Sequence, residues 1–418
     1  MLRLGASMKI AFFTDTYYPH LNGVTVSIDN FARELRKKGH TVYIFAPKTK
    51  PYKNIDEYTI ILSSLKIFSS EPPVTLPIPY KGYRKAFGLD FDIIHVHGNG
   101  AFSLLGYQIA KLKGIPLVST YHTMWTKYTH YFFNGKIMKP NMVAKYLRMF
   151  ANFCDAIITP SEKMKNELAS YGIQKQIHVI PNFVDSQNFQ DNKKGYLHKK
   201  FHIPLSAPIL VSVGRLGKEK NFSFIIRMFK KISIKKPACH LVIVGSGPEE
   251  STLKQLVKDL KLQNRVHFTG KTSVRKMPLV YADSSIFVFS STTEVHPLVT
   301  LEAAATGLPI IVADDQAFAN VVIDNINGFT LPLDEKTFAA KINKLLQNPD
   351  LYAQLGKNSK LLVKKNFSPD KITDELILLY NKIITTHKTK EGNLQILSKA
   401  AFQKLRRTTE AFNRILNN

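Results

Sequence analysis

The sequence has few cysteines and no long apolar run, and each shortage excludes a class of protein. Its two cysteines, Cys154 and Cys239, lie in mostly apolar strings. This predicts buried thiols in a reducing compartment and argues against a disulfide framework. No apolar run approaches the roughly 18 residues that a transmembrane helix needs. Residues 1–7 lack the apolar region of a signal peptide, so we expect a cytoplasmic chain.

Motifs for resident metals and for ATP hydrolysis are also missing. No Cys/His cluster has the spacing of a metal site, and there is no G-x-x-x-x-G-K-[ST] loop. Asp90-Phe-Asp92 imitates a D-x-D metal motif, but it precedes an expected strand, and we interpret it as structural. The sequence therefore predicts neither a metal site nor a cofactor.

Acidic residues are scarce relative to basic ones. The chain has 58 Lys and Arg against 31 Asp and Glu, a formal net charge of +27. Such an excess favours an anionic partner, either nucleic acid or an anionic membrane surface, although a generally basic proteome would also produce it. No DNA- or RNA-binding module is recognisable, so we favour the membrane surface and expect no nucleic acid partner.

What the sequence does contain is a repeated alternation of apolar strands and amphipathic helices. At 418 residues the chain is too long for one ordinary core. Alternating strands and helices predict parallel sheets covered on both faces. In the first half we expect strands at 9–13, 42–45, 93–96, 117–119, 156–158 and 178–180. The first helix carries Val24, Ile28, Phe31 and Leu35 at helical spacing and ends near Gly39.

The pattern then restarts after a crossover segment. Strands are expected at 209–213, 241–244, 266–268, 286–289, 310–312 and 328–331, followed by helices near 336–347, 350–365 and 370–386. We therefore predict a first α/β domain over 1–186 and a second over 187–369. A closing helix over 370–386 is expected to pack back toward the first domain, and a tail over 387–418 follows it.

Glu294 and Glu302 form the most informative pair in the chain. The strand at 286–289 runs into Glu294, and a helix-forming run holds Glu302. Between them, the N–H groups of Leu298 and Val299 lie near the start of a helix, where a phosphate binds favourably. Two Glu at this spacing are common by chance, as a loop Glu and an ordinary helix Glu. In a doubly wound domain, however, they would flank one crevice and suit a nucleotide sugar.

Two further segments follow strands of the second half. Arg215 and Lys220 leave the same strand end and can converge on one anion, as a diphosphate leaving group requires when no metal is present. The alternative is a pair of solvated surface cations. Gly245 and Gly247 lie in a Gly-rich turn that lets a base or phosphate approach the backbone, although such turns are often purely structural.

The first half supplies two comparable segments. Gly23 lies in the loop that leaves the first strand, at the start of the following helix, and this loop can face the second domain. His122 leaves a later strand of the same sheet and should lie at the same edge. A lone histidine is more often structural than functional, so His122 gains weight only from the segments around it.

Taken together, these motifs resemble those of the retaining glycosyltransferases of family 4, which have the GT-B fold of two Rossmann-like domains facing a central cleft. The resemblance covers roughly residues 8–386. It rests on Gly23, His122, the Gly214–Lys220 segment, the Gly245–Pro248 turn and the Glu294–Glu302 pair. Within the family, the segments 12–19 and 120–131 look most like those of diacylglycerol glucosyltransferases.

The resemblance implies roles for these residues. Arg215 and Lys220 would hold the diphosphate of a nucleotide sugar, such as UDP-glucose, and Glu302 would bind the ribose hydroxyls. Glu294 and the N–H groups after it would bind the sugar. His122 would contact the sugar near the reacting carbon, and Gly23 would let the first loop approach the phosphates. The reaction would retain anomeric configuration and need no metal. No carboxylate is obviously placed as a nucleophile, which favours same-face attack.

Two departures from the family pattern affect the donor pocket. Val295 follows Glu294, where the family usually has Gly or another small residue, and the first loop has one Gly where many members have two. A catalytically inactive scaffold is a further alternative, but intact Glu294, Glu302, Arg215 and Lys220 argue against it.

The acceptor is expected to be a lipid hydroxyl, such as that of diacylglycerol, at a membrane surface where the enzyme is peripherally bound. Basic segments with interspersed apolar residues support this expectation: Lys81, Arg84 and Lys85, the segment 136–148, and the tail. Tyr128 and His130 are further candidates for acceptor or membrane contact. A soluble acceptor, such as a sugar phosphate, or another lipid-linked acceptor is the alternative.

The tail is expected to form a basic amphipathic helix over 394–416. Its apolar stripe consists of Leu394, Leu397, Ala401, Leu405, Phe412 and Ile415, and its cations include Lys399, Arg406, Arg407 and Arg414. Such a helix can lie in a membrane interface or pack on the protein or on a neighbouring subunit.

Overall fold

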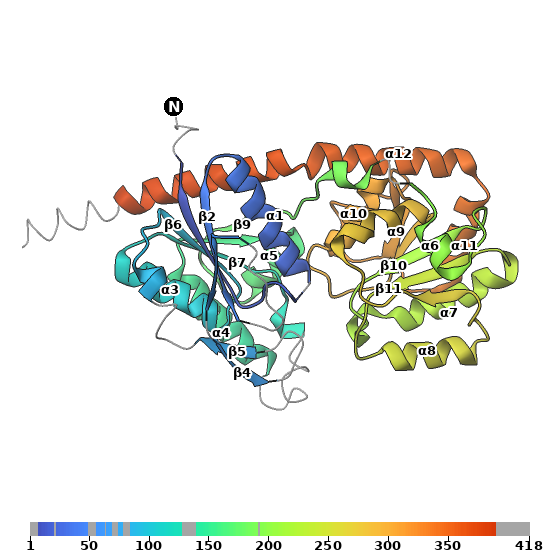
Figure 1. The fold of residues 1–418 in the computed structure, drawn as a ribbon, viewed down its shortest axis with the longest axis horizontal. Helices are drawn as coiled ribbons and strands as arrows, with labels where there is room; N and C mark the ends of the chain where they lie inside the picture. Colours follow the sequence, from blue (N-terminus) through green and yellow to red (C-terminus); the bar gives the residue numbers. More distant parts are fainter. Residues whose placement is uncertain are drawn as a thin grey trace, which may run out of the picture.

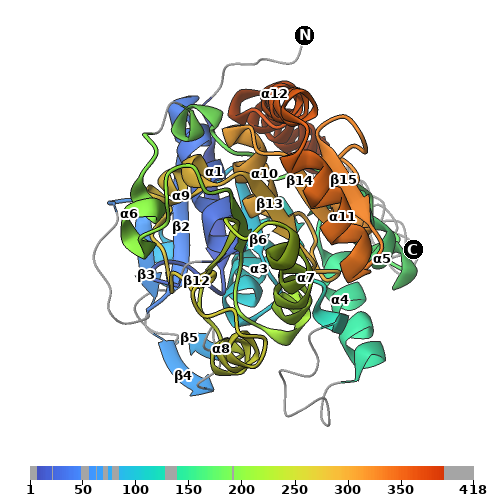
Figure 2. The same cartoon turned by 90° about the vertical axis from the view of Figure 1, so that its right-hand side faces the viewer.

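Two parallel sheets, each covered by helices, form the two halves of the described part of the chain (Figures 1 and 2). The computed structural model describes residues 7–20, 22–48, 56–62, 64–68, 74–77, 84–127, 139–190 and 193–389. The predicted stripe of the tail, together with Lys81, Tyr128 and His130, lies outside the described residues.

The first sheet has seven strands in the order β3-β2-β1-β6-β7-β8-β9, and all its pairs are parallel. The strands are β1 (Lys9–Thr14), β2 (Thr41–Pro47), β3 (Thr59–Leu62), β6 (Ile93–His97), β7 (Leu117–Thr120), β8 (Ala156–Thr159) and β9 (Ile177–Val179). Its helices are α1 (Gly23–Lys37), α3 (Ala101–Lys113), α4 (Pro140–Phe153) and α5 (Glu162–Ser170). β6, β7 and β8 are buried at every position, as expected for strands covered on both faces.

The second sheet has six parallel strands in the order β12-β11-β10-β13-β14-β15. The strands are β10 (Ile209–Val213), β11 (His240–Val244), β12 (Val266–Phe268), β13 (Ile286–Phe289), β14 (Ile310–Ala313) and β15 (Gly328–Leu331). The helices are α6 (Tyr196–Phe201), α7 (Phe222–Lys235), α8 (Glu250–Asp259), α9 (Met277–Asp283), α10 (Leu298–Thr306), α11 (Glu335–Leu346) and α12 (Pro349–Asn366). One apolar cluster lies on each face of this sheet.

Each sheet contains a point where the strand order reverses. In the first sheet, β2 and β3 lie on one side of β1, whereas β6, which comes later in the chain, pairs with β1 on its other side. In the second sheet, β13 returns to the side of β10 in the same way. Ligands of doubly wound sheets bind at the carboxyl ends of the strands at such a switch point. We therefore expect a ligand to bind at the loops after β1 and β6 in the first domain and at the loops after β10 and β13 in the second.

The last described helix, residues 369–389, follows the second domain in sequence but packs on the first (Figure 1). Its buried residues include Ile372, Leu376 and Tyr380, which share a cluster with Ile10 and Phe12 of β1. Lys38, just after α1, pairs with Asp370 and Asp374 of this helix at 3.1 and 2.9 Å. The helix therefore ties the two domains together.

The predicted fold class, a doubly wound α/β protein with two Rossmann-like domains, is confirmed. The edge strand β3 and the antiparallel pair β4 (Ser64–Phe68) and β5 (Val74–Pro77) were not predicted. Cys154 and Cys239 are buried free thiols, as expected. Among the described residues, no helix combines the length and the apolar character needed to cross a bilayer.

Candidate active site

The connection from β13 to α10 holds both predicted carboxylates. Glu294 lies in the loop, and Glu302 is the fifth residue of α10. Leu298 and Val299 open α10, so their N–H groups belong to the first turn, which lacks intrahelical acceptors. This turn therefore offers two backbone donors and the positive end of the helix dipole to an anion.

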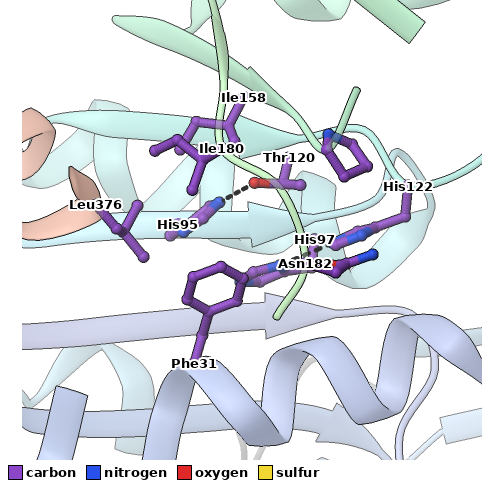
Figure 3. Close-up of a pocket in the computed structure, with 10 residues that line it drawn as sticks. Phe31, His95, His97, Thr120, His122, Ile158, Ile180, Asn182 and Leu376 are labelled. Atoms are coloured by element: carbon purple, nitrogen blue, oxygen red, sulfur yellow. Dashed lines mark hydrogen bonds between the residues drawn. The ribbon is translucent and has the colours of Figure 1, made fainter. Parts of the chain in front are cut away.

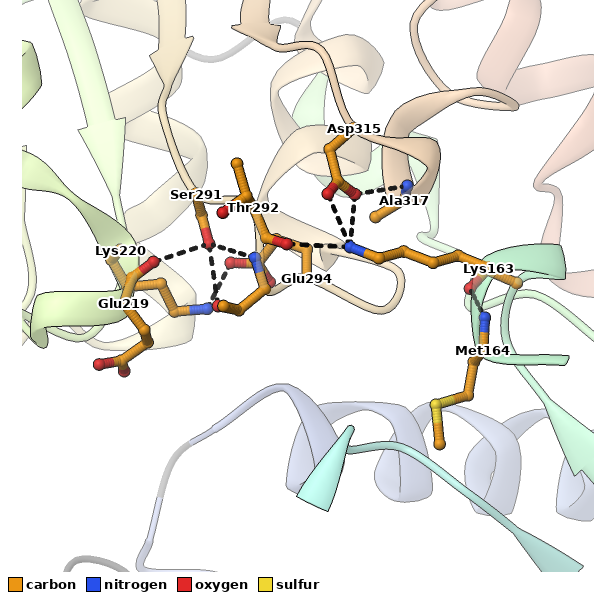
Figure 4. A network of polar contacts seen from close by, with 11 residues as sticks. Lys163, Met164, Glu219, Lys220, Ser291, Thr292, Glu294, Asp315 and Ala317 are labelled. Carbon is orange, nitrogen blue, oxygen red and sulfur yellow. Dashed lines mark hydrogen bonds and ion pairs between the residues drawn. The ribbon is translucent and has the colours of Figure 1, made fainter. Parts of the chain in front are cut away.

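Glu294 is paired with one of the predicted cations. The Nζ of Lys220 forms a short ion pair with Oε1 of Glu294, and both side chains are largely buried (Figure 4). Ser290 Oγ donates to the Asn221 carbonyl at 2.8 Å, which joins the loop after β13 to the loop after β10. The switch point of the second domain thus pairs a cation with a carboxylate on the loop that leads into the N-terminus of α10.

Glu302 is held by a buried tyrosine of α9. The Tyr281 hydroxyl lies 2.8 Å from Oε2 of Glu302 and 3.3 Å from the Val299 carbonyl. Burial raises the pKa of Glu302 from 4.5 to about 7, and the hydrogen bond from Tyr281 only partly opposes this. The carboxylate is therefore fixed in position and poorly solvated. In this state it can accept hydrogen bonds from ligand hydroxyls.

Gly245 and Gly247 follow β11 and lie against the loop that contains Arg215. Gly245 has φ +133°, and a Cβ there would lie 1.9 Å from the Gly214 carbonyl oxygen. A Cβ on Gly247 would lie 2.4 Å from the carbonyl oxygen of Leu216. Both positions are restricted to glycine by the packing of the two loops, a structural reason that the sequence pattern did not reveal.

His122 lies at the switch-point edge of the first domain, beside a second histidine. Its Nε2 is 3.1 Å from Nδ1 of His97, the last residue of β6, and the two rings are nearly parallel (Figure 3). Burial lowers the pKa of His122 to about 4 and holds the pKa of His97 well below 6.5. Both imidazoles are therefore neutral near pH 7.

Asp15 has a positioning role that the sequence did not predict. Its carboxylate accepts hydrogen bonds from the N–H groups of Gly100 and Phe102, both at 2.9 Å, and from Ser103 Oγ at 2.7 Å. It thereby caps α3 and joins the loop after β1 to the loop after β6. A Cβ on Gly100 would lie 2.5 Å from this carboxylate, which explains the glycine. Gly23, at the start of α1, has open space around it.

Contacts between the domains lie close to Glu294. Lys163, in the first turn of α5, contacts both carboxylate oxygens of Asp315 at 2.6 and 2.7 Å and the Thr292 carbonyl at 3.0 Å (Figure 4). Val295 is buried and belongs to an apolar cluster of the first domain. This contact gives a physical reason for an aliphatic residue where the family usually has a small one.

A polar bridge adds to these contacts. Asn182 accepts from Ser27 Oγ at 2.8 Å and donates to the His296 carbonyl at 3.0 Å. Ser27 belongs to α1 of the first domain, and His296 lies in the loop after Glu294. The loop that carries Glu294 is therefore fixed to the first domain at several points.

The remaining predicted residues lie on the surface. Arg84 and Lys85 are exposed on a short helix over 84–87. Asp92 accepts the Lys9 N–H at 2.8 Å, and Asp90 pairs with Lys113 at 3.1 Å. Both carboxylates thus have structural partners. Among the described residues, no group of three His, Cys, Asp or Glu side chains could hold a metal ion.

Comparison with known families matches both halves of the chain. The family model described as "Glycosyltransferase Family 4" matches residues 21–188, and that described as "Glycosyl transferases group 1" matches residues 193–362. The alpha-monoglucosyldiacylglycerol synthase of Streptococcus pneumoniae is 31% identical over 355 residues, which cover 82% of this chain and 80% of that protein. The enzyme of the same name from Acholeplasma laidlawii is 28% identical over 380 residues, covering 85% of this chain and 93% of that protein.

A solved structure supports the fold. HepE from Anabaena, in complex with UDP and glucose, superimposes with a TM-score of 0.74 at 19% identity, covering 90% of this chain and all of that one. At this identity the likeness concerns the arrangement of the two domains and not the ligand that each binds.

Proposed function

The chain belongs to the family 4 glycosyltransferases, and we propose that it transfers glucose from UDP-glucose to the hydroxyl of diacylglycerol at a membrane surface. The names of two relatives, both alpha-monoglucosyldiacylglycerol synthases, support the sugar and the acceptor. The α configuration in the relatives' names matches that of the donor and supports retention.

The observation that carries the proposal is the convergence at the switch point of the second domain. Lys220 pairs with Glu294 there, and Glu294 lies on the loop that leads into the first turn of α10. Cleavage of the sugar–phosphate bond builds negative charge on the diphosphate, and Lys220, Arg215 and the N–H groups of Leu298 and Val299 would stabilise it. These donors would act where a metal acts in other transferases, so the proposed reaction needs none.

The other site residues take roles around this centre. Glu302, positioned by Tyr281, would accept the ribose hydroxyls. Glu294 would bind sugar hydroxyls once the diphosphate attracts Lys220 away from it. Gly245 and Gly247 let the loop after β11 pack closely against the loop that contains Arg215. His122 would approach the sugar from the first domain, and Gly23, which has open space around it at the start of α1, would leave room for the phosphates.

An exposed face of the first domain supports the membrane as partner. On α4, Met142, Met149 and Phe153 are 56%, 53% and 43% exposed, and Lys145 and Arg148 lie exposed among them. Neither α3 nor α4 contains an acidic residue. Because cations attract anionic headgroups while exposed apolar side chains insert between them, this α4 face suits an anionic bilayer surface.

The α4 face continues onto neighbouring elements. The ring of Tyr107 on α3 lies 5.2 Å from that of Phe153. Leu112, near the end of α3, is 71% exposed. Lys113 Nζ donates to the Phe87 carbonyl at 3.0 Å, which places the helix over 84–87, with its exposed cations, next to α3.

A direct assay tests the proposed reaction. The purified protein is incubated with UDP-glucose, UDP-galactose or GDP-mannose and with vesicles that contain diacylglycerol and an anionic phospholipid. We expect a glucosylated diacylglycerol, with the α anomer identified by NMR and a yield unchanged by EDTA. Product from a soluble acceptor alone, a β-linked product, or a requirement for added magnesium or manganese would contradict the corresponding part of the proposal.

Charge reversal on α4 tests the membrane contact. The double variant Lys145→Glu/Arg148→Glu is expected to lower partitioning onto anionic vesicles by about tenfold or more, because each cation near such a surface contributes about 1 kcal/mol. The measurement is co-sedimentation with vesicles at low and high salt. The matched control is Lys336→Glu/Lys344→Glu, which makes the same charge change on exposed positions of α11. Equal losses in both variants would show that only net charge matters.

A further inference from the structure

The contact between His97 and His122 determines where a proton lies. The facing atoms, His97 Nδ1 and His122 Nε2, are 3.1 Å apart. His97 is only 3% exposed, and its ring stacks on His95 with centroids 4.1 Å apart. Phe12 contacts the His97 ring edge-on at 4.6 Å. His97 is therefore tightly packed, and its ring orientation is fixed.

Neither ring carries a positive charge near pH 7. The small cavity beside the two rings is lined by apolar side chains and by His95, Thr120 and Asn182 (Figure 3). No Asp, Glu, Lys or Arg is among the lining residues. Burial lowers the pKa of both rings, and the neighbouring histidines lower the pKa of His97 further.

Two neutral imidazoles share one proton between their facing nitrogens, and two arrangements are possible. If His122 donated from Nε2, the other proton of His97 would lie on its Nε2. That nitrogen is buried and has no hydrogen-bond partner among the described residues. If His97 donates from Nδ1, its Nε2 is a bare acceptor. An unpaired buried N–H is rarer in proteins than an unpaired acceptor, so the second arrangement is favoured.

We propose that His97 donates from Nδ1 to Nε2 of His122 and thereby fixes the His122 tautomer that carries its proton on Nδ1. His97 is thus a positioning residue. His122 then presents a neutral N–H donor to the cleft and does not act as a base. The tautomer follows from the contacts and the burial of the two rings and does not depend on the proposed function. That this N–H serves the donor sugar rests on the proposed function.

The tautomer itself is measured by NMR on protein labelled with ¹⁵N at histidine, without ligand. Protonated and bare imidazole nitrogens resonate far apart, and the His122 signals are assigned with the His122→Gln variant. We expect a protonated Nδ1 and a bare Nε2 for His122. Replacement of His97 by Asn, whose amide places a donor near the position of Nδ1, should preserve this pattern. A protonated Nε2 in the unmodified protein would overturn the proposal, whatever the enzyme's activity.

Kinetics test what the positioning does. His97→Leu places an apolar side chain of similar size that cannot donate. We expect kcat/KM for the donor to fall roughly tenfold to a hundredfold, as it does when a residue that orients a metal-ligating side chain is replaced. His97→Asn should recover most of this loss. UDP affinity should not change in either variant, because UDP is proposed to bind the second domain.

The matched pair of variants separates positioning from packing. Equal activity of His97→Leu and His97→Asn would refute the positioning role. If His97→Leu does not fold, near-normal activity of His97→Asn supports the proposal, and loss of activity in a folded His97→Asn counts against it. If no donor or acceptor gives any product, the proposed function fails while the NMR result still decides the tautomer.

Discussion

Replacement of Lys220 by Met is expected to lower the rate of transfer at saturating donor by a hundredfold or more. Lys220 pairs with Glu294, which lies four residues before the start of α10, where the diphosphate is proposed to leave. Removing one preorganised donor to a developing negative charge costs about 3–4 kcal/mol of transition-state stabilisation. The measurement is kcat with UDP-glucose and diacylglycerol vesicles. Arg215→Met should cause a loss of similar size.

The ion pair with Glu294 makes a second variant necessary. Without Lys220, the Glu294 carboxylate remains largely buried and unpaired, which destabilises a fold. The double variant Lys220→Met/Glu294→Gln removes both charges. We expect its thermal stability to return toward that of the unmodified protein while its activity stays low. Recovery of activity together with stability would show that Lys220 serves the fold and not the leaving group.

Most of the secondary structure could be predicted from local patterns. β13 is a continuous apolar run, β10 and β12 are apolar except for Ser212 and His267, and the predicted bounds of all three strands coincide with those observed. By contrast, β3 follows a polar segment at the edge of the sheet, and β4 and β5 pair antiparallel away from both sheets. The alternation of strands and helices that marks the other strands therefore does not mark these three.

The candidate site was only partly predictable, because its partners are far apart in sequence. The spacing of Glu294 and Glu302 was informative because one strand and the next helix place them. Tyr281, which holds Glu302, and His97, which holds His122, lie on other elements 21 and 25 residues away. Lys163 and Asp315 meet across 152 residues and two domains. No local pattern marks such residues, since only the packed sheets bring them together.

Glu302→Gln is expected to weaken UDP binding about tenfold to a hundredfold at pH 8, because hydrogen bonds to a charged group contribute about 1.5–3 kcal/mol. The proposed partners are the ribose hydroxyls, and both oxygens of the carboxylate can accept hydrogen bonds from them. In the unmodified protein the pKa of Glu302 is about 7, so the charged carboxylate, which is the stronger acceptor, forms only as the pH rises through this value. UDP affinity measured by calorimetry should therefore increase between about pH 6 and pH 8.

Glu302→Gln is the control for this pH dependence. The phosphates of UDP titrate in the same way with either protein, but the variant has no carboxylate at position 302. The affinity of this variant for UDP should change with pH only through the titration of the UDP phosphates. The same slope in both proteins, or an equal loss of UDP affinity in Glu294→Gln, would contradict the assignment of Glu302 to the ribose.

The same substitution is expected to stabilise the fold. A carboxyl whose pKa is raised on folding stabilises the protein below its unfolded pKa and loses that contribution as the pH rises through the folded value. For Glu302, raised from 4.5 to about 7, the cost of ionisation at pH 8 is on the order of 3 kcal/mol, because each pH unit corresponds to about 1.4 kcal/mol. Glu302→Gln should therefore melt at a higher temperature than the unmodified protein at pH 8, and at nearly the same temperature at pH 5. A gain in stability that accompanies a loss of UDP affinity is the result expected of a residue retained for its ligand, whereas a loss of both would make Glu302 a structural residue.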